Sequence, residues 1–429
     1  MRLELGSINI KDIQFADKTE VKSGTLYINK DELAKVAGDD DRIKSIEVFL
    51  ARPGESVRIL PVKDVVEPRV KVEGPGGIFP GFTTGVDQVG SGKTHVLRGA
   101  AVVTTGKIVG FQEGIIDMSG PGAEYTPFSK TNNVVVKVEP IDTIKQHEHE
   151  VVVRMAGLRA SNYLGEAGRA VTPDEVNVYE TKPLLEQVAQ YPDLPKVAYV
   201  YMLQTQGLLH NTFYYGVDVK EIVPTFMYPT EAFDGAIISG NCVSACDKNP
   251  TYIHCNSPVI EELYKEHGKT INFIGCVITN ENVTLMDKER SSNQTAKLIE
   301  FIGAEAVIIS EEGFGNPDAD LVMNCNNIEK KGIKTVLITD EYAGQNGASQ
   351  SLADTTELGN ACVTGGNANQ VIKLPKMDTV IGYPETANVI AGAWDGSLNA
   401  DGSITAEIQV IISATNELGF GYLSAKTIV

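Results

Sequence analysis

The spacing of hydrophobic residues changes near the middle of the chain, and each half predicts a different kind of fold. In the first half, short runs alternate apolar and polar residues or are rich in β-branched residues, with Gly/Pro turns between them. Strands at this spacing are typical of an antiparallel barrel or sandwich. Residues 172–190 carry a helical pattern that bridges to the second half. The predicted strands are residues 3–10, 24–28, 45–50, 57–66, 69–72, 100–109 and 133–138.

The second half alternates strand-like and helical segments. Ser257 and Pro258 form a helix start, and Gly268 is placed to end that helix. Strand, helix and strand in this order predict a doubly wound, mainly parallel sheet. We therefore predict a β-rich, barrel- or sandwich-like N-terminal domain over residues 1–195 and an α/β domain over residues 196–429. The predicted strands are residues 196–203, 235–239, 271–278, 304–310 and 333–339, and the predicted helices are residues 257–268, 292–303 and 316–332.

Composition and charge narrow the possible partners and the cellular location. The 429 residues are 42% hydrophobic, which is ample for packed cores, and the net charge of −19 argues against nucleic acid or an anionic membrane as partner. No apolar run is long enough to cross a membrane, and the N-terminus lacks the apolar core of a signal peptide. We therefore expect a cytoplasmic protein.

The cysteines show no metal-binding pattern. No CxxC pair occurs, so we expect reduced thiols and no metal cofactor. All six lie in the second half: Cys242, Cys246, Cys255, Cys276, Cys325 and Cys362.

Polar residues follow several predicted strands of the second half. Glu311 follows strand 304–310 and Asp340 follows strand 333–339. Ligands of open parallel sheets bind at the carboxyl ends of the strands, so these carboxylates are candidate acid–base groups. The amides of Gly313, Gly315 and Asn316, at a helix start, are candidates to hold a substrate carboxylate. The alternative is that strand ends are polar because loops are polar.

Three weaker patterns point mainly to structural roles. Residues 90–94 (GSGKT) resemble part of a P-loop, but Asp87 stands where the pattern requires glycine, so we predict a turn and no nucleotide. Residues 146–150 (QHEHE) would place two histidines on one face of a strand, yet their charge favours a solvated loop or edge strand. His210 is either an acid–base group in the cleft or a half-buried histidine.

The most informative segment is residues 239–250, in which Gly240 and Asn241 precede Cys242. A cysteine after a small-residue turn at a strand end is a candidate nucleophile. Its alternative role is that of a small buried hydrophobic residue.

Three segments carry a specific family resemblance: residues 241–249 (NCVSACDKN), 109–129 (VGFQEGIIDMSGPGAEYTPFS) and 66–82 (VEPRVKVEGPGGIFPGF). The chain resembles the component B proprotein of the glycine, sarcosine and betaine reductases. The resemblance covers essentially the whole chain and includes its length and the order of its β-rich and α/β parts.

The resemblance implies that the precursor cleaves itself between Asn241 and Cys242, and that Cys242 becomes a pyruvoyl group. The thiolate would attack the Asn241 carbonyl, β-elimination would break the Cβ–S bond, and hydrolysis would release ammonia and leave the ketone. Gly240 would give the backbone the freedom that this shift needs. Asp247, Lys248 and His254 are near in sequence, but the sequence does not identify the base.

The resemblance also implies a reductive deamination. The substrate amine would form a Schiff base with the pyruvoyl group, and a selenolate of selenoprotein A would displace the amine from the α-carbon. Component C would then convert the selenoether to acetyl phosphate, with reducing equivalents from a thioredoxin-linked system. The chain would also assemble with the selenocysteine-containing gamma subunit of component B.

Glycine is the first candidate substrate, and sarcosine and betaine are alternatives. Betaine is a quaternary amine that cannot form a Schiff base, so its activation would differ. Two other classes stay open, a pyruvoyl-dependent decarboxylase and a non-catalytic structural subunit in which Cys242 is an ordinary buried thiol.

Overall fold

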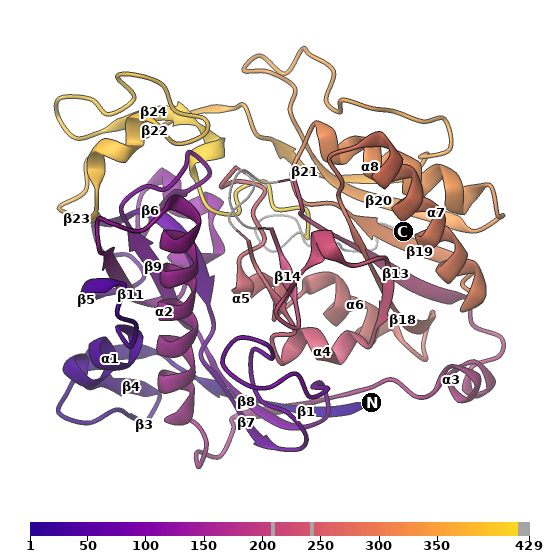
Figure 1. Cartoon of the computed structure of the whole chain (residues 1–429), viewed down its shortest axis with the longest axis horizontal. Helices are drawn as coiled ribbons and strands as arrows, with labels where there is room; N and C mark the ends of the chain where they lie inside the picture. The colour runs from indigo at the N-terminus through magenta and orange to yellow at the C-terminus, as the bar shows by residue number, and fades with distance from the viewer. Residues whose placement is uncertain (207–210, 241–243, 419–429) are drawn as a thin grey trace.

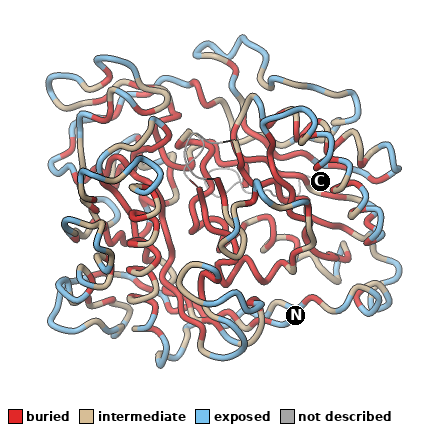
Figure 2. Tube along the Cα trace, in the orientation of Figure 1, coloured by how far each residue is buried: buried red, intermediate tan, exposed pale blue. Residues whose placement is uncertain are grey.

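The computed structural model describes residues 1–206, 211–240 and 244–418. The chain has a mixed α/β architecture, with a β-rich part around one long helix on the left of Figure 1 and a helix-covered parallel sheet on the right. One buried hydrophobic cluster runs through both parts and joins residues such as Leu3, Val103, Tyr199 and Ile338. Figure 2 shows this buried interior continuing from one part to the other.

The first half contains two larger sheets and a small one. Their strand pairs are mixed, because β1 lies parallel to β8 and β9 lies parallel to β11, where an all-antiparallel arrangement was expected. The alternation of residues predicts strands but does not encode their direction. The sheets are β12 (Glu175–Glu180), β1 (Arg2–Asn9), β8 (Gly92–Arg98) and β7 (Arg69–Glu73); β10 (Gly114–Asp117), β6 (Val57–Val66), β9 (Ala100–Gly106), β11 (Asn132–Pro140) and β5 (Ile43–Ala51); and β2 (Asp12–Phe15), β4 (Thr25–Ile28) and β3 (Glu20–Lys22).

Helix α2 (Gln146–Glu166) is the long helix of this part and includes the QHEHE segment, so the prediction of a loop or edge strand there was wrong. Buried residues Val152, Ala156 and Ala160 recur at helical spacing and pack into the same core as the inward-facing residues of β9 and β11. In a helix, side chains two residues apart diverge by about 200°, so the two histidines do not share a face. Helix α1 (Lys30–Ala37), which the sequence analysis missed, packs beside it.

The segment 172–190 divides into two elements, so the prediction of one helix was also wrong. Its first part is β12, which pairs antiparallel with β1, and its second part is helix α3 (Leu184–Gln190). Val176 and Val178 alternate with polar residues, a strand pattern, and Pro183 directly precedes the helix. In the GSGKT segment, Gly90 and Ser91 form a bend, as predicted, whereas the remaining three residues already belong to β8.

The second half is built around a six-stranded sheet in which all strands except the edge strand β16 are parallel. Numbered from β13, the parallel strands lie in the order 2-1-3-4-5, and this order reverses between β13 and β19. Ligands bind at such a reversal in doubly wound sheets. The sheet runs β16 (Thr225–Met227), β18 (Asn272–Asn280), β13 (Lys196–Leu203), β19 (Ala306–Ser310), β20 (Lys334–Glu341) and β21 (Cys362–Asn367).

Helices cover both faces of this sheet, because the side chains of β13 are buried on both of its faces. Ala198 and Val200 pack with α7 and α8, whereas Tyr199 and Tyr201 pack on the other side with α5 and α6. Alternate strand residues point to opposite faces, so a strand with both sets buried reads as a continuous apolar run. The helices are α4 (Pro229–Phe233), α5 (Thr251–His254), α6 (Pro258–Glu266), α7 (Leu285–Phe301) and α8 (Asn316–Glu329).

The segment 235–239 does not add a strand to the parallel sheet, which corrects the prediction. Only β17 (Ile237–Ile238) forms, and it pairs antiparallel with β14 (Phe213–Tyr214), which also pairs with β15 (Val217–Asp218). A two-residue strand is too short to be distinguished from a turn by its hydrophobic pattern.

The C-terminal segment returns to the β-rich part. Strand β23 (Thr379–Gly382) lies parallel to β6, and strands β22 (Val371–Leu374) and β24 (Ile404–Glu407) form a hairpin-like pair near it, drawn in yellow in Figure 1. Residues 413–416 then run beside residues 245–248, with amide hydrogen bonds from Ser413 to Ala245 and from Thr415 to Cys246. Within the described part of the chain, no helix has both the length and the apolar character needed to cross a membrane.

Candidate functional site

The candidate site lies at the carboxyl ends of the parallel strands, beside the reversal between β13 and β19. Glu281 follows β18, Glu311 and Glu312 follow β19, and Asp340 lies near the end of β20. The helix α8 begins a few residues after Glu312, so its N-terminus faces the same edge. The fold therefore collects polar groups from several strands at one place, as the position of the reversal predicts.

Among the described residues, six buried carboxyl groups lie at or beside the strand ends, in addition to Asp318 and Asp320 on α8. Each belongs to a residue that is at most 1% exposed. Two of them, Asp247 and Glu417, come from the segments 244–250 and 413–418, which run across the strand ends. The six are Asp247, Glu281, Glu311, Glu312, Asp340 and Glu417.

Backbone amides hold several of these carboxylates. Glu312 Oε1 accepts the Asn249 amide at 2.8 Å, and Glu281 Oε1 accepts the Glu312 amide at 2.8 Å. The Thr339 hydroxyl donates to Glu311 Oε1. The second oxygens of Glu281, Glu311 and Glu312 accept no hydrogen bond from the described residues. Buried oxygens without donors are costly, so this edge is poised to accept protons or a cation.

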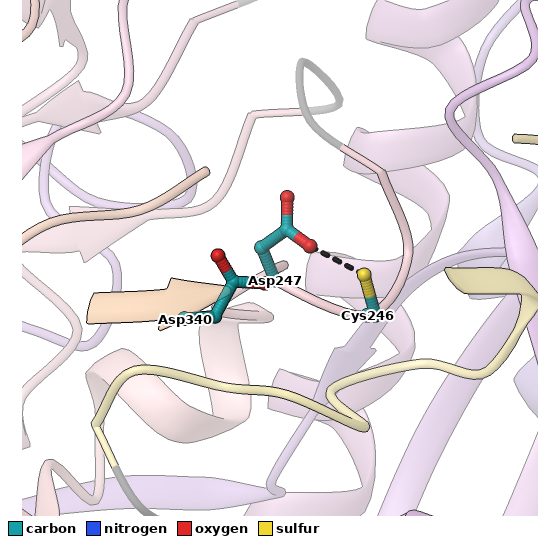
Figure 3. A group of neighbouring side chains, drawn as sticks. All are labelled: Cys246, Asp247 and Asp340. Carbon is teal, nitrogen blue, oxygen red and sulfur yellow. Dashed lines mark hydrogen bonds between the residues drawn. The ribbon is translucent and has the colours of Figure 1, made fainter. Parts of the chain in front are cut away.

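Cys246, Asp247 and Asp340 form a tighter group within this region. One ligand atom from each lies within 4.8 Å of the other two, and Figure 3 shows Asp247 between the thiol and the Asp340 carboxylate. The Cys246 thiol donates to Asp247 Oδ1, and the Thr415 hydroxyl donates to Asp340 Oδ2 at 2.8 Å. The remaining oxygens, Asp247 Oδ2 and Asp340 Oδ1, have no donor among the described residues.

The buried ammonium of Lys248 stands next to the predicted cleavage segment. Lys248 Nζ donates to the Gly240 carbonyl oxygen at 2.6 Å. A cavity of about 20 Å³, bounded by Gly240, Lys248, Asp64 and Ser239 among others, adjoins this contact. A space of this size admits about one water molecule.

Burial dominates the acid–base character of the site. It raises the pKa of Glu312 to about 7, against smaller opposing effects of the Asn249 amide and the Lys248 ammonium. Burial likewise raises the pKa of Asp247 to about 7 and that of Glu311 well above its usual range. His254, whose Nδ1 lies 2.6 Å from the Tyr201 hydroxyl, has its pKa lowered to about 3, first by burial and then by Lys248. Groups that titrate near neutrality are suited to proton transfer.

The predicted site residues differ in how the structure places them. Glu311 and Asp340 are both buried at the carboxyl edge, and Gly240 is linked to this edge through Lys248. Asn241, Cys242 and His210 lie outside the described residues.

Two of the predicted carboxylate-binding amides, those of Gly313 and Gly315, already have partners from the chain itself. The Gly313 amide donates to Glu417 Oε1 at 2.9 Å, and the Gly315 amide donates to Asp318 Oδ1 at 2.8 Å. Asn316 begins α8, and its carbonyl oxygen accepts a hydrogen bond from Lys288 at 2.8 Å. A substrate carboxylate at Gly313 would take the place of Glu417, and this role stays a prediction.

Sequence reasoning missed several members of the site. Glu281 could have been found, because it directly follows the predicted strand 271–278 and its continuation through Asn280. Asp64 and Glu417 gave no local signal, because only the tertiary fold brings them near Thr251 and Gly313.

A large cavity lies elsewhere, between the β1–β12 edge and helices α3 and α6. It measures about 770 Å³ and is lined by Arg98, Tyr179, Glu261 and His267 among others. It contains none of the predicted site residues and does not lie at the carboxyl ends of the parallel strands.

Comparison with known proteins places the chain among reductase components. The family model of glycine/sarcosine/betaine reductase component B subunits matches residues 1–426. The chain is 68% identical to the glycine reductase complex component B subunits alpha and beta of Acetoanaerobium sticklandii, over the full length of both chains.

Two further relatives come from Peptoclostridium acidaminophilum. The chain is 59% identical to the sarcosine reductase complex component B subunit alpha and 38% identical to the betaine reductase complex component B subunit alpha. Each comparison covers 99% of this chain and 100% of the relative. No solved structure was found to match the chain.

Proposed function

The chain belongs to the family of glycine/sarcosine/betaine reductase component B subunits, and on this basis we propose that it is the substrate-activating subunit of a glycine reductase. The observation that carries this choice is the 68% identity, over all 429 residues, to a glycine reductase component. Identity falls to 59% for the sarcosine relative and to 38% for the betaine relative. Glycine is therefore the proposed substrate, and sarcosine is the second candidate.

The proposed cofactor is a pyruvoyl group made from Cys242 by cleavage after Asn241. Such a group supplies an electrophilic ketone that withdraws electrons from a bound amine. The residues around the segment fit this chemistry, because Gly240 contacts a buried cation and the nearby Glu312 Oε2 lacks a donor among the described residues.

We assign distinct tasks to the described residues of the site. Lys248 fixes the Gly240 carbonyl and so orients the backbone that leads to the scissile bond. Glu312 takes up or releases a proton at Oε2, since its pKa of about 7 allows both states near neutrality. The closed surroundings exclude bulk water, which strengthens electrostatic interactions with the substrate.

The proposal extends to assembly and organisation. As a component B subunit, the chain would work with a selenocysteine-containing gamma subunit, selenoprotein A and component C. It would act in the cytoplasm as a β-rich unit of residues 1–195 and an α/β unit of residues 196–429. The return of β23 to β6 joins the two units after cleavage as well as before it.

Intact-mass spectrometry of the purified complex tests the proposal. We expect two fragments, residues 1–241 and 242–429, with a C-terminal fragment that gains mass on borohydride treatment. Borohydride in the presence of glycine should add to that fragment the mass of glycine less one water molecule plus two hydrogens, because the Schiff base forms with loss of water before it is reduced. Cys242→Ala should leave the chain whole. Cys325→Ser, a buried thiol on α8, serves as the matched control and should cleave normally.

The competing functions give different results in the same experiment. Trapping of sarcosine in preference to glycine would reassign the substrate. Release of carbon dioxide from a trapped amino acid would favour a decarboxylase. A chain that stays whole within the assembled complex would leave only the structural role.

A further inference from the structure

We propose that Cys246, Asp247 and Asp340 bind one divalent transition-metal ion, with Zn²⁺ as the first candidate. The site joins the segment that follows Cys242 to the parallel strand β20. It goes beyond the proposed function, because it requires neither cleavage nor a substrate. It also replaces our expectation from the cysteine spacing that the chain binds no metal.

Geometry is the first argument for the ion. The three ligand atoms lie within 4.8 Å of one another. A tetrahedral zinc ion bonded at about 2.0–2.3 Å needs its ligands about 3.3–3.8 Å apart, so the side chains would close around the ion by about 1 Å. Asp247 Oδ2 and Asp340 Oδ1, in residues that are 1% and 0% exposed, have no donor among the described residues. In Figure 3 the side chains of Asp247 and Asp340 lie against each other with the thiol beside them.

Charge is the second argument. Two buried carboxylates in contact repel each other unless a proton or a cation lies between them. Glu417 and Glu311 add two more buried carboxyl groups to the same edge, and Lys248 directs its ammonium to Gly240. A divalent cation would compensate this charge without exposing the carboxylates to water.

The donor set selects the class of metal. Magnesium and calcium prefer sites made of oxygen atoms alone, whereas a thiolate favours zinc and the later divalent transition metals. Three protein ligands leave one tetrahedral position open. Thr415 supports the site, since its hydroxyl orients the Asp340 carboxylate and its amide holds the Cys246 carbonyl.

Metal analysis of the full chain, purified without chelators, tests the proposal. We expect about one zinc ion per chain, and at least a fivefold loss in Cys246→Ser and Asp340→Asn. Cys325→Ser, which removes a buried thiol that contacts Thr335, is the matched control and should retain the metal. Substitution with Co²⁺ should give a thiolate-to-cobalt charge-transfer absorption that is absent from Cys246→Ser.

The result that overturns the proposal is a wild-type chain that contains no metal and, after incubation with excess Zn²⁺ or Co²⁺, binds no more of either ion than Cys246→Ser. A proton shared by Asp247 and Asp340 would then explain the cluster. If the variants fail to fold, the cobalt spectrum of the wild-type chain decides alone, because a bound thiolate is visible in it. A chain that binds metal and stays uncleaved would support the site while contradicting the proposed function.

Discussion

The β-rich part and the carboxyl edge of the parallel sheet both bury charged side chains, but only the first pairs them one by one. Each buried acid named below for the β-rich part has a cation in direct contact. At the carboxyl edge, the six buried carboxyl groups named above have no ion pair with a described cation, and the Lys248 ammonium donates to the Gly240 carbonyl instead. The pairs are Arg58–Asp117, Lys63–Glu113, Arg69–Glu67 and Lys71–Asp234, and in the last of them the acid follows α4 in the second half of the chain.

This difference indicates that the paired charges stabilise the fold, whereas the unpaired carboxyl groups at the strand ends take part in chemistry. A paired buried charge is neutral to its surroundings and becomes costly only when its partner is removed. Unpaired carboxyls instead destabilise the folded chain, and such a cost is typical of functional sites. Substitutions in the two regions should therefore have opposite effects on stability and activity.

The largest effect is expected from Arg58→Ala. Arg58 binds both oxygens of Asp117, at 2.6 and 2.7 Å, and its loss leaves a buried carboxylate unpaired. The free energy of unfolding should fall by about 3–5 kcal/mol in chemical denaturation. Lys107→Ala, at a half-exposed ion pair with Glu139, is the control and should change the free energy of unfolding far less, because solvent screens this pair. Equal effects of the two substitutions would remove the contrast between buried and surface pairs.

The second prediction concerns pH and His254, a buried base beside Lys248. Its pKa falls from 6.5 to about 3 on folding, so the unfolded chain binds a proton that the folded chain does not. Stability is therefore lost as the pH falls below about 6.5, by about 3 kcal/mol at pH 4. His254→Asn keeps an acceptor for the Tyr201 hydroxyl. In this variant the free energy of unfolding, measured as a function of pH, should fall less below pH 6.5. If the free energy of unfolding of the wild-type chain and of His254→Asn falls equally with pH, His254 is not the group responsible.

The third prediction concerns Lys248, the buried cation that contacts the Gly240 carbonyl at the carboxyl edge. Lys248→Met removes the ammonium from the Gly240 carbonyl, and we expect cleavage to slow by about 100-fold in a time course of fragment formation. Lys288→Met is the matched control, because Lys288 is equally buried but pairs with Asp320. It should lower stability without slowing the cleavage of folded chains. If both variants cleave equally slowly, the contact of Lys248 with the Gly240 carbonyl is not what speeds cleavage.

The smallest effect is expected from Glu312→Gln, and its sign is opposite to that of Arg58→Ala. Burial raises the pKa of Glu312 from 4.5 in the unfolded chain to about 7 in the folded chain. The unfolded chain therefore loses its proton first, and Glu312 lowers the stability of the folded chain as the pH rises from about 4.5 to 7. The variant should be more stable by about 1 kcal/mol at pH 8, with less gain at pH 5, while glycine reduction falls about tenfold. Lower stability with unchanged activity would assign Glu312 a structural role.

The sequence predicted the α/β part better than the rest because its signals are local. Strand 196–203 and helix 316–332 match β13 and α8 closely, since a buried apolar run and a Gly-Asn-Pro helix start identify them. The return of β23 to β6 joins residues more than 300 positions apart, and no local pattern records it. The same reasoning explains why Glu311 and Asp340 were found and Glu417 was not.

The interleaving of the strands has a consequence for how a cleaved protein could assemble. Strands β13 and β16 precede residue 241 yet pair with β18, which follows it, while β23 adds to the sheet of β6. Neither fragment alone contains all the strands of either of these two sheets. If the chain is cleaved as proposed, cleavage would follow folding, and recovery of the cut protein from denaturant would become a bimolecular reaction whose rate depends on concentration.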